Sequence, residues 1–166
     1  MEDNRRRLHV LVVDDDVVGL ECYAEWLVAA GHRVTTRTAA VGTAADVVEL
    51  RPDVALLDVL MPGLRGDDLA RLLKRHPATR NLAVILHSCL PSETLRPLIM
   101  TSGALGAIEK TLTQSVFTFS FHALVMKLRP PTHGSESIVP SSPAPAASGT
   151  YRVAPVYGGA PKRKSG

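Results

Sequence analysis

The sequence predicts an α/β fold in which a parallel sheet is covered by helices on both faces. Five short segments rich in leucine and β-branched residues alternate with five segments whose apolar residues recur at helical spacing. This alternation is typical of right-handed βαβ units, whose strands lie parallel. It ends near Arg129, and the rest of the chain has the composition of a segment without a hydrophobic core.

The predicted strands are short and mostly apolar. In α/β proteins a parallel sheet is buried on both faces, so its strands read as continuous apolar runs. We assign strands to residues 8–13, 32–37, 54–57, 83–87 and 107–109. Each of them is followed by a helical segment.

The predicted helices have recognisable ends. We expect Asp16 to cap the N-terminus of the first helix and Gly31 to follow its C-terminus. The second, third and fifth helices cover about residues 42–50, 67–75 and 113–128. For the fourth, Ser92 has the character of an N-cap, but Pro97 would then lie inside the helix. Either that helix is kinked, or it begins late with Pro97 in its first turn.

The last 37 residues differ from the rest of the chain in composition and charge. Residues 130–166 hold 7 Pro, 5 Gly, 6 Ser and 5 Ala. A segment of this composition buries too little apolar surface to offset the entropy lost on ordering. The formal charge of the whole chain is +3, yet residues 1–129 hold 15 basic and 15 acidic side chains, so the excess lies in the last segment. We predict a domain over residues 6–129 and a disordered tail with a basic end over residues 130–166.

Composition also indicates a cellular location. No stretch approaches the ~18 apolar residues needed to cross a bilayer. The apolar run at residues 10–13 stops at three aspartates, so it is too short for a signal peptide. Two cysteines, Cys22 and Cys89, are too few for a disulfide framework. We therefore expect a cytoplasmic protein with no membrane association.

Polar side chains follow the carboxyl ends of four predicted strands. They are Asp14, Asp15 and Asp16 after the first strand, Asp58 after the third, Ser88 after the fourth and Lys110 after the fifth. Open α/β sheets bind ligands beyond this edge. Carboxylates this close repel one another unless a cation is present, and hard oxygen ligands suit Mg²⁺. The set predicts a site where carboxylates, Mg²⁺ and a lysine surround a phosphoryl group during its transfer. We expect Asp16 to be a helix cap and not a ligand.

The sequence resembles the receiver domain of two-component response regulators, of the single-domain, chemotaxis-regulator-like type. The matching stretches are VLVVDDD at 10–16, PDVALLDVLMPGLRG at 52–66, AVILHS at 83–88 and GALGAIEK at 103–110. The resemblance implies a doubly wound, flavodoxin-like (βα)5 fold with strand order 2-1-3-4-5.

The resemblance also implies a role for each residue at this edge. Asp58 is the expected phosphoacceptor, and Ser88 and Lys110 are expected to contact the phosphoryl oxygens. Asp14, Asp15, Asp58 and the backbone carbonyl of Leu60 are expected to hold Mg²⁺. The protein would assist its own phosphorylation and also its own dephosphorylation, which would be slow. It would not be an enzyme acting on a separate substrate.

Two positions depart from the family pattern. Ala107 stands where the family often has a switch aromatic, which places the usual output route in doubt. Thr111 stands where a cis proline is usual, and because a non-proline cis peptide costs ~3 kcal/mol, a trans bond and a different loop are open alternatives.

Two leucines bear on hydrolysis. Leu60 and Leu90 flank the expected path of an attacking water, and neither side chain can orient that water or accept its proton. We therefore expect the phosphoryl group on Asp58 to be long-lived.

The leading functional hypothesis is a stand-alone response regulator that receives its phosphoryl group from a sensor histidine kinase or a histidine phosphotransfer protein. Without a following DNA-binding domain, its output would be binding to another protein, and residues 117–128 could also serve a homodimer. The alternative is a pseudo-receiver that acts independently of phosphorylation.

Two other classes of protein fit the sequence less well. A haloacid-dehalogenase-like phosphatase would need a second aspartate where this chain has Leu60. A nucleic-acid binder is suggested by the basic residues 162–164, but aromatic residues make up 4% of the chain and offer little surface for stacking bases.

Overall fold

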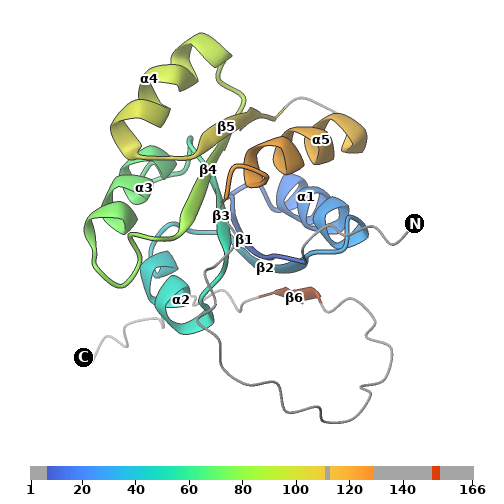
Figure 1. Cartoon of the computed structure of the whole chain (residues 1–166), viewed down its shortest axis with the longest axis horizontal. Helices are drawn as coiled ribbons and strands as arrows, with labels where there is room; N and C mark the ends of the chain where they lie inside the picture. Colours follow the sequence, from blue (N-terminus) through green and yellow to red (C-terminus); the bar gives the residue numbers. More distant parts are fainter. Residues whose placement is uncertain (1–6, 111–112, 129–150, 154–166) are drawn as a thin grey trace, which may run out of the picture.

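A parallel β-sheet forms the centre of the molecule in the computed structural model, which describes residues 7–110, 113–128 and 151–153 (Figure 1). Its strands are β1 (His9–Val13), β2 (Arg33–Arg37), β3 (Val54–Asp58), β4 (Ala83–Ser88) and β5 (Gly106–Glu109). They lie in the order 2-1-3-4-5 and all pair in parallel. The predicted fold class is therefore confirmed.

Five helices alternate with these strands and cover both faces of the sheet. They are α1 (Val17–Ala29), α2 (Thr43–Leu50), α3 (Gly66–Arg75), α4 (Ser92–Ser102) and α5 (Gln114–Val125). Helices α1 and α5 pack on one face, and α2, α3 and α4 pack on the other (Figure 1). The predicted helices and strands agree with these bounds to within a few residues.

Side chains from alternate positions of each strand fill two separate cores. In β1, Val10 and Val12 pack with α1 and α5, whereas Leu11 and Val13 pack with the other three helices. Every residue of β1 and of β3 is buried. This explains why these strands read as apolar runs, since a sheet covered on both faces favours apolar side chains on both.

Helix α1 has the predicted ends. The side chain of Asp16 accepts a hydrogen bond from the Val18 N–H at 3.2 Å, which satisfies one of the free donors of the first turn. After the helix, Gly31 has a φ of +91°, a conformation that L side chains rarely adopt.

Helix α4 begins early and contains its proline. Ser92 is its first residue and Pro91 its N-cap, so the alternative of a late start is wrong, as is Ser92 as the cap. Pro97 lies inside the helix and cannot donate a hydrogen bond to the carbonyl of Glu93. Glu93 and Pro97 are both exposed, so water can satisfy that carbonyl.

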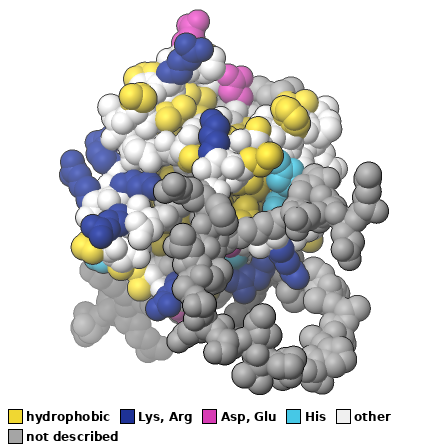
Figure 2. Space-filling model, viewed as in Figure 1, with side chains coloured by type: hydrophobic (Ala, Val, Ile, Leu, Met, Phe, Trp, Pro, Cys, Tyr) yellow, Lys and Arg dark blue, Asp and Glu magenta, His cyan; other side chains and the backbone are white. Residues whose placement is uncertain are grey.

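The predicted disordered tail lies almost entirely outside the described residues. Within residues 130–166 the structure describes strand β6 (Tyr151–Val153), which pairs in parallel with β2 and adds a sixth strand to the sheet. The domain boundaries therefore stay a prediction. No helix in the described part of the chain is long and apolar enough to cross a membrane. Figure 2 shows Lys and Arg side chains dispersed among hydrophobic ones on the face in view.

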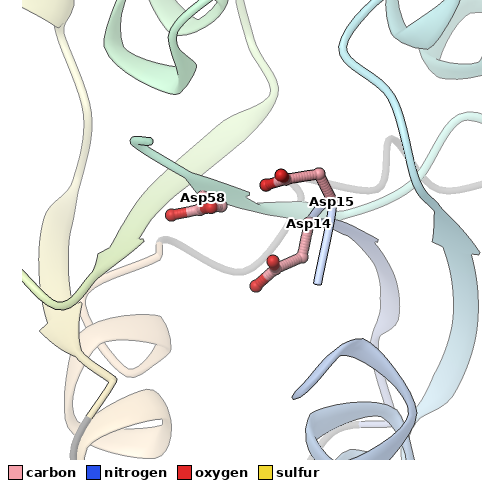
Figure 3. Close-up of side chains that lie close together, drawn as sticks. All are labelled: Asp14, Asp15 and Asp58. Carbon is pink, nitrogen blue, oxygen red and sulfur yellow. The ribbon is translucent and has the colours of Figure 1, made fainter. Parts of the chain in front are cut away.

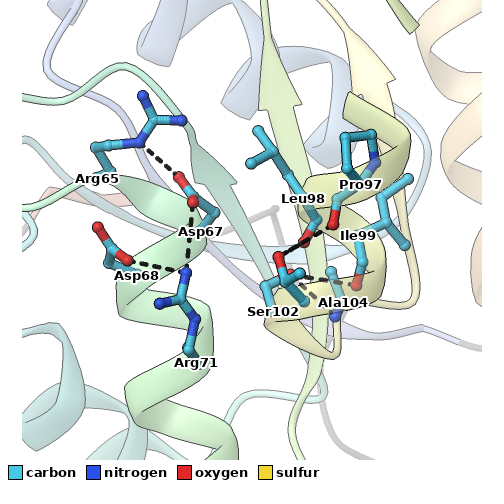
Figure 4. A network of polar contacts seen from close by, with 10 residues as sticks. Arg65, Asp67, Asp68, Arg71, Pro97, Leu98, Ile99, Ser102 and Ala104 are labelled. Carbon is cyan, nitrogen blue, oxygen red and sulfur yellow. Dashed lines mark hydrogen bonds and ion pairs between the residues drawn. The ribbon is translucent and has the colours of Figure 1, made fainter. Parts of the chain in front are cut away.

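Helix α3 begins directly against the end of β3. The Gly66 N–H donates to the carbonyl of Val59 at 3.2 Å, and a Cβ on Gly66 would overlap the carbonyl group of Asp58. Asp67 is buried and accepts from Arg65 Nε at 2.9 Å, while Asp68 pairs with an arginine one turn later (Figure 4). Carboxylates in a first helical turn interact favourably with the helix dipole. The contacts of Gly66 place the start of α3 against the backbone of Asp58 and Val59.

We predict that Gly66→Ala destabilises the protein, whereas Gly19→Ala does not. A methyl group at residue 66 would push against backbone atoms, so we expect the free energy of unfolding to fall by about 1–3 kcal/mol, as overpacking usually causes. A methyl group at residue 19 would meet no backbone atom at this distance but the outer oxygen of the Asp16 carboxylate, at 2.8 Å from Oδ2, and a small rotation of that carboxylate relieves the contact. The better helix propensity of alanine should offset that contact. Urea unfolding followed by circular dichroism measures both, and equal stability of the two variants would contradict the close approach.

Candidate functional site

Three carboxylates meet at the carboxyl edge of the sheet. Asp14 and Asp15 follow β1, and Asp58 is the last residue of β3, the strand that pairs with β1. One oxygen from each lies within 4.8 Å of the others (Figure 3). Asp14 and Asp58 are buried, whereas Asp15 is exposed. The structure thus brings together the three carboxylates among the four predicted metal ligands, the fourth being the backbone carbonyl of Leu60.

Lys110 joins this cluster from the end of β5. Its Nζ lies 2.7 Å from Asp14 Oδ2 and 3.2 Å from Asp58 Oδ2, and the side chain is 12% exposed. Its backbone N–H donates to the carbonyl of Ser88 at 2.8 Å. The hydrogen bond between the β4 and β5 ends therefore holds the lysine over the two buried carboxylates.

The burial of the site changes the pKa values of its charged groups. Burial raises the pKa of Asp14, and the hydrogen bond and charge of Lys110 oppose this effect only in part. Burial alone would lower the pKa of Lys110, but the hydrogen bond and charge of Asp14, followed by the charge of Asp58, outweigh it and raise that pKa. The ammonium group is therefore held in its charged form.

The donor set fits a hard divalent cation. Three carboxylates face one ammonium group, so negative charge is in excess when all are ionised. Oxygen ligands and an open, exposed side at Asp15 suit Mg²⁺, which keeps several of its waters. Such an ion would reduce the repulsion between the carboxylates.

Ser88 and Leu60 also lie at this edge. Ser88 is fully buried at the end of β4, and its Oγ accepts a hydrogen bond from the Leu90 N–H at 3.3 Å. The Leu60 N–H donates to Asp58 Oδ1 at 3.1 Å, and its side chain is 48% exposed. The expected role of the Leu60 carbonyl as a ligand and of Ser88 as a phosphoryl contact both stay predictions.

Asp16 supports the site without joining the carboxylate cluster. Its side chain caps α1, and its N–H donates to Asp14 Oδ1 at 3.0 Å. The prediction that Asp16 is a cap is therefore confirmed. The cap fixes the turn that carries the two metal-ligand candidates.

A group of rings lies beside the site, and the sequence does not predict it. The strand pattern places His87 against a core or a helix, and its ring packs 4.3 Å from that of Tyr23 and 5.6 Å from that of Phe117. The helical spacing places Tyr23 on an apolar helix face but carries no signal of its contact with β4. Thr111, whose peptide geometry is an open question in the sequence, lies outside the described residues.

Comparison with known proteins places these residues in a family. The model of the response regulator receiver domain matches residues 10–119. The response regulator PleD of Caulobacter vibrioides is 33% identical over 103 residues, which cover 62% of this chain and 23% of PleD. The DNA-binding response regulator MtrA of Mycobacterium tuberculosis is 41% identical over 70 residues, covering 41% of this chain and 30% of MtrA. The chain thus spans about a quarter of the length of the curated relatives it matches first.

Solved structures share the fold at lower sequence identity. The chemotaxis protein CheY4 of Vibrio cholerae superposes with a TM-score of 0.66 at 20% identity, covering 72% of this chain and 99% of that one. A two-component response regulator of the LuxR family from Aurantimonas sp. gives a TM-score of 0.67 at 18% identity, covering 75% of this chain and 89% of that one. At these identities the likeness supports the fold alone.

We predict that His87 makes the protein sensitive to acid. Burial, and after it the positive charge of Lys110, lowers the pKa of His87 to about 3. Between that value and the ordinary 6.5 the unfolded chain binds a proton that the folded chain does not, so stability falls as the pH falls through this window. From pH 7 to pH 5 the expected loss from this group is about 2 kcal/mol.

Urea unfolding at the two pH values tests this prediction. His87→Leu should lose this part of the pH dependence, whereas His76→Gln, which changes an exposed histidine, should keep it. A His87→Leu variant as acid-sensitive as the unchanged protein would contradict the account.

Proposed function

The chain belongs to the family of response regulator receiver domains, and on this premise we propose that it is a phospho-accepting module of a two-component phosphorelay, with Asp58 as the acceptor. The observation that carries the proposal is the position of Asp58. It is buried at the end of β3, within the cluster of three carboxylates and 3.2 Å from the ammonium of Lys110. A sensor histidine kinase or a histidine phosphotransfer protein supplies the phosphoryl group.

The residues around Asp58 suit this chemistry. An oxygen of its carboxylate attacks the phosphorus of a phosphohistidine, and the phosphorus–nitrogen bond breaks. Such transfers depend mainly on positioning and on neutralising charge at the phosphoryl oxygens. Lys110 pairs with one of these oxygens, and the hydroxyl of Ser88, at the end of the adjacent strand, donates to another.

Mg²⁺ is the cofactor that this site favours. Asp14, Asp15, Asp58 and the backbone carbonyl of Leu60 would hold the ion, which would supply positive charge beside the phosphoryl oxygens. The excess of carboxylates over ammonium groups supports this assignment.

The output is binding to a second protein in the cytoplasm. A second candidate function, a pseudo-receiver that acts without phosphorylation, is favoured by one observation. Ala107, on β5, offers a single half-buried methyl group where the family often carries a switch aromatic.

Incubation with acetyl phosphate and Mg²⁺, followed by intact mass measurement, separates these two functions. We expect the unchanged protein to gain one phosphoryl group and Asp58→Asn to gain none, because the amide cannot accept it. Asp15→Asn should gain far less at limiting Mg²⁺. Asp16→Asn is the matched control, since an asparagine can still cap α1 and the three clustered carboxylates remain. An unchanged protein without a mass gain, or an Asp58→Asn variant that keeps it, would contradict the proposal.

We also predict that Leu60 slows the hydrolysis of the phosphoryl group. Its side chain is exposed at the rim of the site, and an amide there could orient an attacking water. Leu60→Asn should therefore shorten the half-life of the phosphorylated protein several-fold, less than the ~10²-fold expected of a true proton acceptor.

The half-life follows from loss of the phosphoryl group after the acetyl phosphate is removed. Leu72→Asn is the control, because Leu72 is similarly exposed but lies on α3. Equal half-lives for Leu60→Asn and the unchanged protein would remove Leu60 from the account of hydrolysis.

A further inference from the structure

Tyr23 is the centre of a cluster of rings between α1, β4 and α5. Its ring centroid lies 4.3 Å from that of His87, 5.1 Å from that of Phe117 and 5.3 Å from that of Trp26. The contacts with His87 and Trp26 are edge-to-face, with interplanar angles of 84°. The separations from Phe117 and Trp26 are those of favourable ring pairs, and the contact with His87 is closer still, so the packing is directional as well as apolar.

The ring cluster adjoins the acidic site through β4. His87 is 1% exposed and lies opposite Asp58 in the β3–β4 register, and its carbonyl accepts from the Val59 N–H at 3.0 Å. The next residue along the strand is Ser88. The backbone that carries the acceptor therefore also carries the histidine against which Tyr23 packs.

The charge of Lys110 acts on both rings. Burial and then this charge lower the pKa of His87, and burial raises the pKa of Tyr23 while the same charge is the largest opposing effect. In the described structure the Lys110 ammonium is shared between Asp14 and Asp58. A change in its position would change the electrostatic field at Tyr23 and His87 together.

Tyr23 also has room to respond. Tyr23 lines a cavity of about 270 Å³ together with residues of β5 and α5, among them Glu109, Val116 and Phe117. Val116 is 48% exposed, so the cavity lies close to the surface. On β5 itself, Ala107 has no ring that could rotate.

We propose that Tyr23 couples the state of Asp58 to the α1–α5 face of the molecule. The inference rests on the proposed function. When Asp58 carries a phosphoryl group, the Lys110 ammonium moves from Asp14 toward the phosphoryl oxygens. The Tyr23 ring then changes its packing against His87 and Phe117, and the surface formed by α1 and α5 changes with it. Tyr23 is a positioning residue in this scheme, because it touches no reacting atom.

Trp26 allows a direct test, since it is the one tryptophan of the chain and packs against both Tyr23 and Phe117. Its fluorescence is recorded before and after acetyl phosphate and Mg²⁺ are added, and phosphorylation is measured by mass on the same samples. We expect a change in intensity or wavelength in the unchanged protein and the loss of most of that change in Tyr23→Leu at equal phosphorylation.

Two further variants separate coupling from a loss of structure. Tyr23→Phe keeps the ring and should keep the fluorescence response. If the response depended on the hydroxyl group instead, this variant would lose it. Phe119→Leu is the matched control on α5, where the side chain is 77% exposed, and should also keep the response.

The outcomes that follow decide against the coupling. A fully phosphorylated protein with unchanged Trp26 fluorescence, or a Tyr23→Leu variant with the full change, overturns this inference and leaves the proposed function standing. The absence of a mass gain in the unchanged protein overturns the proposed function, and the inference with it.

Discussion

The contact of Lys110 with two buried carboxylates is the interaction on which the site depends. Asp14 and Asp58 come from adjacent strands and would repel each other at the edge of the sheet, where burial makes unpaired charge costly. The ammonium of Lys110 lies within ion-pair distance of both. The lysine can do this because β5 lies beside β4 and its N–H bonds to the carbonyl of Ser88. The strand order thus determines the balance of charge.

Much of this arrangement follows from the sequence because it depends on local pattern. A buried parallel strand is a short apolar run, so a polar residue just after it must lie at the carboxyl edge of the sheet. The same reasoning is enough to place Asp14, Asp58, Ser88 and Lys110 at that edge. The cap at Asp16 is predictable for a related reason, because it depends on its neighbours in the chain.

Other features depend on how the helices and strands pack together and on which residues that packing leaves exposed, and the sequence carries no signal for them. The tolerance of α4 for Pro97 depends on exposure of the neighbouring backbone, which the helical pattern does not reveal. The close approach of Gly66 to Asp58 appears only when α3 is placed against β3. The contact of Tyr23 with His87 likewise joins α1 to β4, and these two residues are 64 positions apart in the sequence (87 − 23 = 64).

The two faces of the sheet are built from different side chains, and this difference bears on how the site can influence the surface. The buried residues that pack with α2, α3 and α4 are aliphatic or methionine, whereas the face under α1 and α5 holds Phe117 and Phe121 in its core, with Tyr23 and Trp26 packed against it. Aliphatic contacts are non-directional, but ring pairs depend on angle. A charge displaced at the shared edge therefore has a more specific effect on the α1–α5 face. Because Ala107 on β5 carries no ring, the directional contacts among the described residues near the site lie on the side of α1 and α5.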